Sequence, residues 1–334
     1  MAADDRPICV FDSGLGGLTV VAEIASAMPY EDIVYLGDSA RVPYGIKSLQ
    51  TVRRFALEDA AFLLGRSPKL MVVACNTASA AAIDAIEQLC PVDVVDVIRP
   101  GVAKALAAAD GVLAVIGTEA TISSGAYQRQ IALADPGREV VSATCPLLVP
   151  IVEEGRASDD PIVLHVLADY LKELQRRRPA VLILGCTHYP LLSGAISKLM
   201  GPQVVLVSSA LAAAQEVARR LVTTGATARL DRKGGLHCYT TDNSDRFARL
   251  AKRFLGAKRH IDKVEYVGTD ELAEALRLMS DQPAGKAGKQ AGLPATHDDG
   301  AGLYLSRPRQ AAADGAAGAP LRDARGPARG SPAT

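Results

Sequence analysis

Residues 8–17 read ICVFDSGLGG, an apolar run that passes directly into a polar, glycine-rich loop. The run Ile8–Phe11 is continuously apolar rather than alternating, which is typical of a strand buried on both faces of a sheet. The next stretch, Leu18–Ala27, has the length and spacing of a helix. A strand, a tight loop and a helix in this order predict the start of a parallel βα unit.

The same pattern recurs along the chain, with helix-length stretches such as Leu49–Leu64, Ala78–Leu89 and Pro161–Gln175 between short apolar runs. This alternation predicts an α/β fold of doubly wound parallel sheets. The further strands are expected at Ile33–Leu36, Leu70–Ala74, Val92–Val97, Val112–Ile116, Glu139–Ser142, Val181–Leu184 and Val204–Val207, with a weaker one at Leu236–Tyr239.

The length of 334 residues favours two domains, because single cores stop growing near roughly 250–300 residues. Arg99-Pro100-Gly101 interrupts the pattern, and Ser208-Ser209 marks the corresponding return. We expect a discontinuous first α/β domain, 1–98 plus 208–280, and a second α/β domain, 99–207, related to it by pseudo-symmetry. Residues 281–334 are rich in Ala, Gly, Pro and Arg without an apolar period, and this composition predicts a disordered tail.

Charge and hydropathy exclude several classes of partner. The 37 basic and 37 acidic residues give a net charge of zero, so we expect neither a nucleic-acid partner nor an anionic membrane surface. No apolar stretch approaches the roughly 18 residues of a membrane span. The acidic N-terminus runs directly into a strand and does not resemble a signal peptide, which predicts a cytoplasmic protein.

The six cysteines are scattered, and no two lie within ten residues of each other. The CxxC signatures of zinc sites and thioredoxin-like pairs are therefore absent, and we predict no metal site. Reduced thiols are expected in the cytoplasm. The cysteines are Cys9, Cys75, Cys90, Cys145, Cys186 and Cys238.

Small polar residues collect directly after five predicted strands, in residues 12–17, 37–45, 75–77, 117–121 and 185–190. Ligands of open α/β sheets bind beyond the carboxyl ends of the strands. These loops therefore predict an active site for a small polar ligand in the cleft between the two domains.

The glycine loop after the first strand has two interpretations. A dinucleotide fingerprint needs G-x-G-x-x-G, and Gly14 and Gly16 fit, but Thr19 occupies the third position. Asp12 would also set a carboxylate against the pyrophosphate. We therefore favour a tight βα turn that brings the Asp12 carboxylate and the Ser13 hydroxyl into the cleft.

Cys75 and Cys186 stand out among the cysteines, although a lone cysteine at a strand end is more often inert. Each ends a predicted strand and opens a helix, where backbone N–H groups favour the thiolate. Each is followed by ligand-type side chains, at residues 76–77 and 187–188. One activated thiol with His188 as its base would indicate a covalent nucleophile.

Two thiols in matching positions indicate a different chemistry, in which one acid/base group acts on each side of a substrate carbon. One thiolate removes a proton while the opposite thiol delivers one to the other face, and the carbon is inverted. His188, expected to be exposed, helps to poise the thiol, and Asp12 assists Cys75 by shuttling or orienting a proton.

Six motifs resemble those of the glutamate racemase family, in the same order and over about residues 7–270. They are FDSGLGGLTV (11–20), YLGDSARVPYG (35–45), ACNTASA (74–80), IGTEATI (116–122), CPLLVPIVEEG (145–155) and LGCTHYPLL (184–192). Ser39 stands where the family more often has threonine, which keeps the hydroxyl.

The resemblance implies an isomerase that interconverts L- and D-glutamate without a cofactor and supplies D-glutamate for peptidoglycan, cell-wall biogenesis and cell shape. It implies catalytic roles for Cys75 and Cys186, and glutamate as the partner of a homodimer. Asp12, Glu153 and His188 match residues that tune proton transfer. The substrate-contacting positions are Asp12, Ser13, Tyr44, Gly45, Asn76, Thr77, Thr187 and His188.

Other readings remain open. Aspartate racemases share this fold but typically carry Glu two residues after the second cysteine, so His188 favours glutamate. A hydrolase or lyase would use only Cys186 and His188, and an idle member would act as a binding protein, for example on a DNA-processing enzyme.

Several of these site residues also have a purely structural interpretation. From spacing alone, residues 44–45 form a rigid turn and residues 76–77 cap a helix. Arg41 is interpreted as structural, because a cation near the substrate ammonium would be unfavourable.

Overall fold

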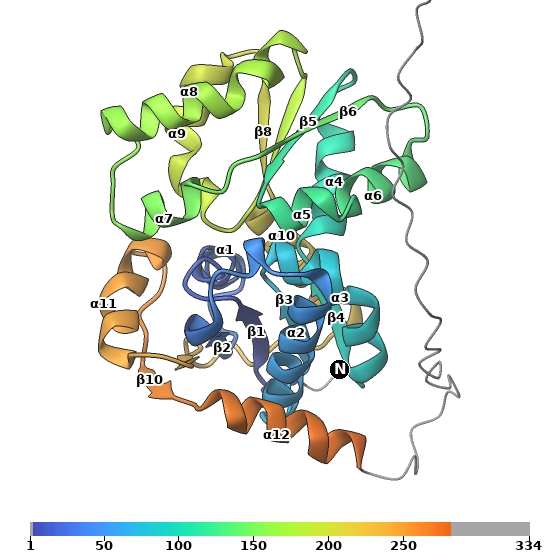
Figure 1. Ribbon diagram of the computed structural model, residues 1–334. Helices are drawn as coiled ribbons and strands as arrows, with labels where there is room; N and C mark the ends of the chain where they lie inside the picture. The colour runs from blue at the N-terminus through green and yellow to red at the C-terminus, as the bar shows by residue number, and fades with distance from the viewer. Residues whose placement is uncertain (1–2, 282–334) are drawn as a thin grey trace, which may run out of the picture. The chain divides into compact units, whose positions relative to one another are not determined.

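Ten strands form two sheets in residues 3–281, the part of the chain that the computed structural model describes, and every strand pairing is parallel (Figure 1). The six-stranded sheet has the order β10-β9-β2-β1-β3-β4, and the four-stranded sheet has the order β6-β5-β7-β8. The strands are β1 (Ile8–Asp12), β2 (Ile33–Gly37), β3 (Leu70–Val73), β4 (Asp93–Asp96), β5 (Leu113–Gly117), β6 (Val140–Thr144), β7 (Val181–Gly185), β8 (Val205–Ser208), β9 (Leu236–Thr240) and β10 (Lys263–Tyr266).

The predicted α/β fold with two parallel sheets is confirmed. Strand β10 was not predicted, because it is an edge strand of alternating charged and apolar residues that stays partly exposed. Strand β6, also an edge, lies slightly later than expected. Along the chain, the strands of the six-stranded sheet come both before and after those of the four-stranded sheet. The exact domain boundaries, 1–98 plus 208–280 and 99–207, stay a prediction, and the predicted tail lies outside the described residues.

Helices cover both faces of the sheets (Figure 1). Helices α1, α10 and α11 pack on one face of the six-stranded sheet, and α2, α3 and α12 pack on the other. The helices are α1 (Leu18–Ala27), α2 (Leu49–Leu64), α3 (Asn76–Leu89), α4 (Ile98–Ala108), α5 (Glu119–Ser123), α6 (Ala126–Ala134), α7 (Leu148–Glu153), α8 (Pro161–Arg176), α9 (Ser193–Met200), α10 (Ser209–Thr224), α11 (Ser244–Leu255) and α12 (Thr269–Ser280), with 3₁₀ turns η1 (Ser39–Arg41), η2 (Tyr44–Ile46) and η3 (Tyr189–Leu192).

The strands are apolar throughout because both of their faces are buried. In β1, Ile8 and Val10 join the cluster under α1, while Cys9 and Phe11 join the cluster under α2. Burying each large aliphatic or aromatic side chain contributes about 1.5–3 kcal/mol. This explains why the continuous apolar runs, rather than alternating ones, identified the central strands.

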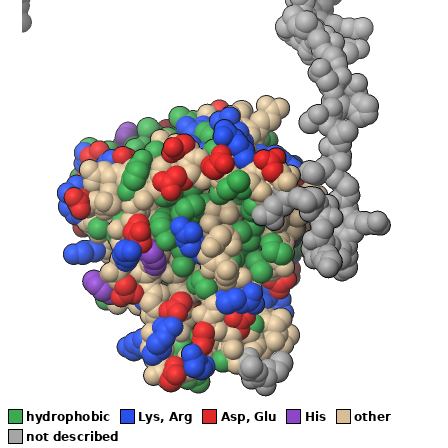
Figure 2. All heavy atoms as spheres, turned by 90° about the horizontal axis from the view of Figure 1, so that it is seen from below, with side chains coloured by type: hydrophobic (Ala, Val, Ile, Leu, Met, Phe, Trp, Pro, Cys, Tyr) green, Lys and Arg blue, Asp and Glu red, His purple; other side chains and the backbone are tan. Residues whose placement is uncertain are grey.

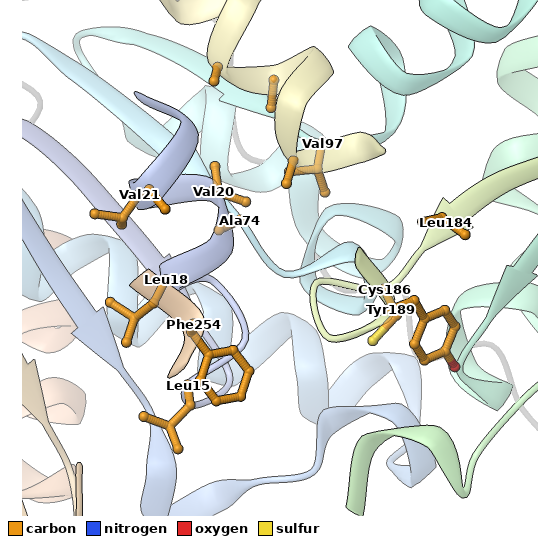
Figure 3. Packing of buried hydrophobic residues seen from close by; sticks show 14 of the residues in the cluster. Leu15, Leu18, Val20, Val21, Ala74, Val97, Leu184, Cys186, Tyr189 and Phe254 are labelled. Carbon is orange, nitrogen blue, oxygen red and sulfur yellow. The ribbon is translucent and has the colours of Figure 1, made fainter. Parts of the chain in front are cut away.

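One apolar cluster continues from the first sheet to the second. It contains Val20 and Val21 of α1, and it reaches Leu184 of β7 and Tyr189 of η3 (Figure 3). Cys186, in the loop between β7 and η3, belongs to the same cluster. The loops that follow the strands of both sheets are therefore held against a common core.

The charges are distributed as the net charge of zero suggests. Figure 2 shows basic and acidic side chains interspersed over the face seen from below. Within residues 3–281, no helix combines the length and the apolar character needed to cross a membrane.

One charged pair is fully enclosed. The side chain of Lys69, just before β3, is inaccessible to solvent, and its Nζ lies 2.5 Å from Glu31 Oε2 and donates to the Asp4 carbonyl at 2.7 Å. Glu31 Oε1 accepts from the Ala228 N–H at 2.8 Å. The pair therefore links the segments before β1, β2 and β3 to the segment after α10.

Removing one member of this pair leaves the other charge buried without compensation. We expect Lys69→Met to lower the free energy of unfolding by about 3–5 kcal/mol, measured by urea denaturation. Lys263→Met is the matched control, because Lys263 is exposed and pairs with a partly exposed Glu265. It should change stability by less than about 1 kcal/mol. Equal effects of the two variants would contradict this role of Lys69.

Candidate active site

A cavity of about 30 Å³ lies where loops from the two sheets meet. Its lining comes from residues that follow β1, β2 and β3 of the first sheet, from the end of β7 and the residues after β5 and β7 of the second, and from Val149 of α7. Nine of the ten predicted site residues line it, and Asp12 does not. The lining residues are Ser13, Val42, Pro43, Tyr44, Gly45, Cys75, Asn76, Thr77, Thr118, Val149, Gly185, Cys186, Thr187 and His188.

Cys75 is the N-cap residue of α3, as its position after a strand predicted. Its Sγ accepts a hydrogen bond from the Ala78 N–H at 3.4 Å and lies 3.8 Å from Ser13 Oγ. Burial, and after it the charge of Asp12, raises the pKa of Cys75 to about 12. The helix terminus therefore does not produce a thiolate here, contrary to the expectation, and Cys75 is a thiol at neutral pH.

Cys186 has a different setting. It was expected to open a helix, and this is wrong: the short turn η3 begins at Tyr189, and α9 begins only at Ser193. Its Sγ lies 3.8 Å from His188 Nδ1 instead. The interaction that acts on this thiol comes from an imidazole and not from a helix terminus.

His188 was expected to be exposed but is only 3% exposed. Its Nε2 lies 3.1 Å from Glu153 Oε1, and its ring packs edge-on against Phe254. Burial lowers the pKa of His188, but hydrogen bonds to Cys186 and Glu153 outweigh it and raise the pKa to about 10. The imidazole is therefore protonated at neutral pH, and its positive charge lies beside the Cys186 Sγ.

Asp12 lies behind the cavity wall rather than on it. Its Oδ1 accepts from the Gly14 N–H at 3.0 Å, and its Oδ2 accepts from Thr187 Oγ1 at 3.3 Å. Burial raises the pKa of Asp12, while the charge of His188 and these hydrogen bonds oppose the rise. The carboxyl group therefore orients Thr187 and acts on the cavity through its charge.

Asn76 and Thr77, at the start of α3, face the cavity from the first sheet. Asn76 Nδ2 donates to Tyr127 Oη at 2.8 Å, whereas its buried Oδ1 has no hydrogen-bond partner among the described residues. Thr77 Oγ1 lies 2.9 Å from Thr118 Oγ1. A free acceptor and a set of hydroxyl groups suit a ligand that carries both an ammonium and carboxylates.

Tyr44 and Gly45 line the cavity from the turn η2. The Tyr44 hydroxyl points away from it, toward Asp38 and Asp59. At Gly45 a β-carbon would lie only 2.5 Å from the Thr118 Cβ, so this approach requires glycine. Arg41 does not line the cavity, which agrees with its structural interpretation.

Thr118 and Val149 line the cavity but were not among the predicted site residues. The sequence did offer a sign for Thr118, because it directly follows β5 and caps α5. Val149 lies inside the apolar helix α7, where periodicity suggests only packing. Among residues 3–281, no group of three or more His, Cys, Asp or Glu side chains is arranged to hold a metal ion.

The chain is similar to known racemases over most of its length. It is 47% identical to a glutamate racemase of Geobacter metallireducens, over 76% of this chain and 94% of that protein. For a glutamate racemase of Thermus thermophilus the identity is 46%, over 80% and 98%.

Solved structures agree with the sequence comparison. The glutamate racemase of Bacillus anthracis superposes with a TM-score of 0.74 at 38% identity, over 78% of this chain and 97% of that one. The glutamate racemase of Francisella tularensis in complex with D-glutamate also gives 0.74 at 38% identity, over 80% and 99%. The profile of the Asp/Glu/hydantoin racemases matches residues 15–217. The chain therefore belongs to the Asp/Glu/hydantoin racemase family.

Proposed function

We propose that the protein interconverts L-glutamate and D-glutamate by proton transfer between Cys75, Cys186 and the substrate α-carbon, without a cofactor. The observation that carries this proposal is the unequal setting of two thiols on one cavity. Cys186 lies beside a protonated His188, whereas burial keeps Cys75 a thiol. A two-base racemization needs this unequal pair, one base and one acid at the same time.

The reaction then balances without a further reactant. The Cys186 thiolate takes the α-proton, and the electron pair of the broken C–H bond stays on the carbon. That pair then takes the proton from the Cys75 thiol on the opposite face, which inverts the configuration and leaves Cys75 as the thiolate. The reverse reaction exchanges the two roles.

We infer that glutamate is the substrate because the similar proteins are named glutamate racemases. The structure of one of them is a complex with D-glutamate. The hydroxyl groups of Ser13, Thr77 and Thr187 and the free Asn76 Oδ1 suit its charged groups. The cavity of about 30 Å³ has room for only a few water molecules, so its walls must separate to admit an amino acid. A larger space of about 290 Å³ adjoins it and shares Val42, Pro43, Gly45, Thr118 and Val149.

The biological setting follows from the resemblance to glutamate racemases. D-Glutamate made by the protein would enter peptidoglycan synthesis and thereby support cell-wall biogenesis and cell shape. The expected location is the cytoplasm, and the expected assembly is a homodimer.

Replacing either thiol should remove racemization. We expect Cys75→Ser and Cys186→Ser each to lower kcat for L- and D-glutamate by about 10³-fold or more, because a serine hydroxyl is a far weaker acid and base. Circular dichroism of the glutamate solution measures the rate. Cys90→Ser is the control, since Cys90 lies at the end of α3 and does not line the cavity.

Exchange in deuterium oxide separates racemization from the alternatives. The wild-type protein should incorporate deuterium at the α-carbon of glutamate and release no other product, and each serine variant should retain exchange from at most one enantiomer. Full racemase activity in both variants would refute the two-thiol mechanism. A released hydrolysis or elimination product without exchange would instead identify a hydrolase or lyase.

The charge of His188 predicts a pH dependence. Since its pKa is raised to about 10, the imidazole keeps its proton below that pH and loses it as the pH rises through it. We expect kcat/KM for L-glutamate, which reports on groups of the free enzyme, to fall through the same range. His188→Asn should lower activity and lose this alkaline limb. His165→Asn, on an exposed face of α8, should retain it, and an unchanged limb in His188→Asn would contradict the assignment.

A further inference from the structure

A buried polar cluster supports the segment from Asp38 to Ile46, which supplies Val42, Pro43, Tyr44 and Gly45 to the cavity wall. We call it the Tyr44 cluster, and none of its members except Tyr44 lines the cavity. It combines three residues of this segment, two of α2 and one directly after β9. Its members are Asp38, Arg41, Tyr44, Glu58, Asp59 and Thr241.

The two fully buried acids of the cluster share a single cation, Arg41. Arg41 donates to Asp38 Oδ2 at 2.6 Å and to Asp59 Oδ1 at 3.0 Å, and a third donor contacts Glu58. The side chains of Asp38 and Asp59 are fully buried. Glu58 has a second cation beside it, since Arg54 Nε lies 3.8 Å from Glu58 Oε1. Asp38 and Asp59 have no cation within reach except Arg41 among the described residues, and two buried ionised carboxylates on one shared guanidinium would leave uncompensated negative charge inside the protein. One of these two acids therefore holds a proton.

The hydroxyl of Tyr44 identifies which acid this is. Its Oη lies 2.5 Å from Asp38 Oδ2 and 3.0 Å from Asp59 Oδ2, yet a hydroxyl has a single proton to donate. Both acids accept from Arg41, and Asp38 accepts from Thr241 Oγ1 in addition, so Asp38 is the better acceptor for the Tyr44 proton. The second contact then requires a proton on Asp59.

The electrostatic environment of Asp59 agrees with this assignment. Burial, followed by the charge of Asp38, raises the pKa of Asp59 well above its usual range, although Arg41 and the hydrogen bond with Tyr44 oppose the rise. Glu58, the residue before Asp59 in α2, faces the same arginine, and its side chain is 10% exposed.

We infer that Asp59 is a positioning residue that acts as a neutral carboxylic acid and donates a hydrogen bond to Tyr44. The chain Asp59–Tyr44–Asp38 holds the Tyr44 side chain away from the cavity. The main chain of the next residue, Gly45, is thereby set against Thr118 at the wall where the substrate binds. The inference rests on the proposed function in one respect, because glutamate is the substrate with which binding at this wall is measured.

Kinetics of three variants test the positioning role. Asp59→Asn retains a donor for Tyr44 and an acceptor for Arg41, so its KM for L-glutamate should stay within about threefold of the wild type. Asp59→Leu and Tyr44→Phe break the chain, and each should raise KM by about tenfold while kcat changes less. Asp84→Asn, on the exposed side of α3, is the matched control for an Asp-to-Asn change.

The same variants give the results that would overturn the inference. If Asp59→Asn is as impaired as Asp59→Leu, Asp59 acts as a carboxylate and the proton is misplaced. If Tyr44→Phe leaves KM unchanged, the chain does not position the wall. Should Asp59→Leu fail to fold, Tyr44→Phe still decides the second point, because it removes only the hydroxyl.

Infrared spectroscopy tests the proton without turnover. The wild-type protein at neutral pH should show the C=O stretch of a buried protonated carboxyl group, which Asp59→Asn should lose and Cys75→Ser should retain. Absence of this band, or its persistence in Asp59→Asn, would refute the assignment. If the wild-type protein fails to racemise glutamate, the proposed function fails, while the infrared result still decides the state of Asp59.

Discussion

The active site depends on the close approach of two loops from different sheets, residues 12–17 after β1 and residues 186–188 after β7. A β-carbon on Gly16 would lie 2.2 Å from Thr187 Oγ1 and 2.5 Å from His188 Cε1, so no other residue fits at this position without displacing these two side chains. Thr19 Oγ1, at the position where a dinucleotide fingerprint has glycine, lies 3.0 Å from the Thr187 carbonyl. The residue that argued against nucleotide binding thus joins the two sheets. This contact sets Cys186 and Cys75 on one cavity.

The two loops bring together two thiols that lie beside opposite charges. Both cysteines are buried. Beside Cys186 lies the imidazolium of His188, which Glu153 holds from the other side. At Cys75 the nearby charge is that of Asp12, which adds to the effect of burial. The asymmetry therefore comes from the neighbours of the two thiols and not from the pseudo-symmetric strand positions that they share.

The difference between local sequence patterns and contacts made only in the folded chain explains which features the sequence could predict. Strands buried on both faces carry continuous apolar runs, and the residues after parallel strands gather at one edge, so both the fold and the cavity-lining loops were predictable. Strand β10 is polar and partly exposed, and no local pattern marks it. The burial of His188 and the place of Asp12 behind Thr187 depend on how the second sheet packs against the first. No periodicity within a single loop encodes such a contact.

The Tyr44 cluster shows the same dependence on tertiary contacts. Asp38 and Arg41 are neighbours in sequence, but Asp59 lies on α2 and Thr241 follows β9, so only the folded chain surrounds Tyr44 with two acids. Such a buried polar network gains little free energy over an apolar core, and it is unfavourable unless every member is bonded. Its hydrogen bonds are directional, however, and apolar packing is not. This wall needs such a directional restraint, because a β-carbon at Gly45 would lie only 2.5 Å from the Thr118 Cβ. The need for orientation, more than for stability, accounts for charged groups buried at this point of the fold.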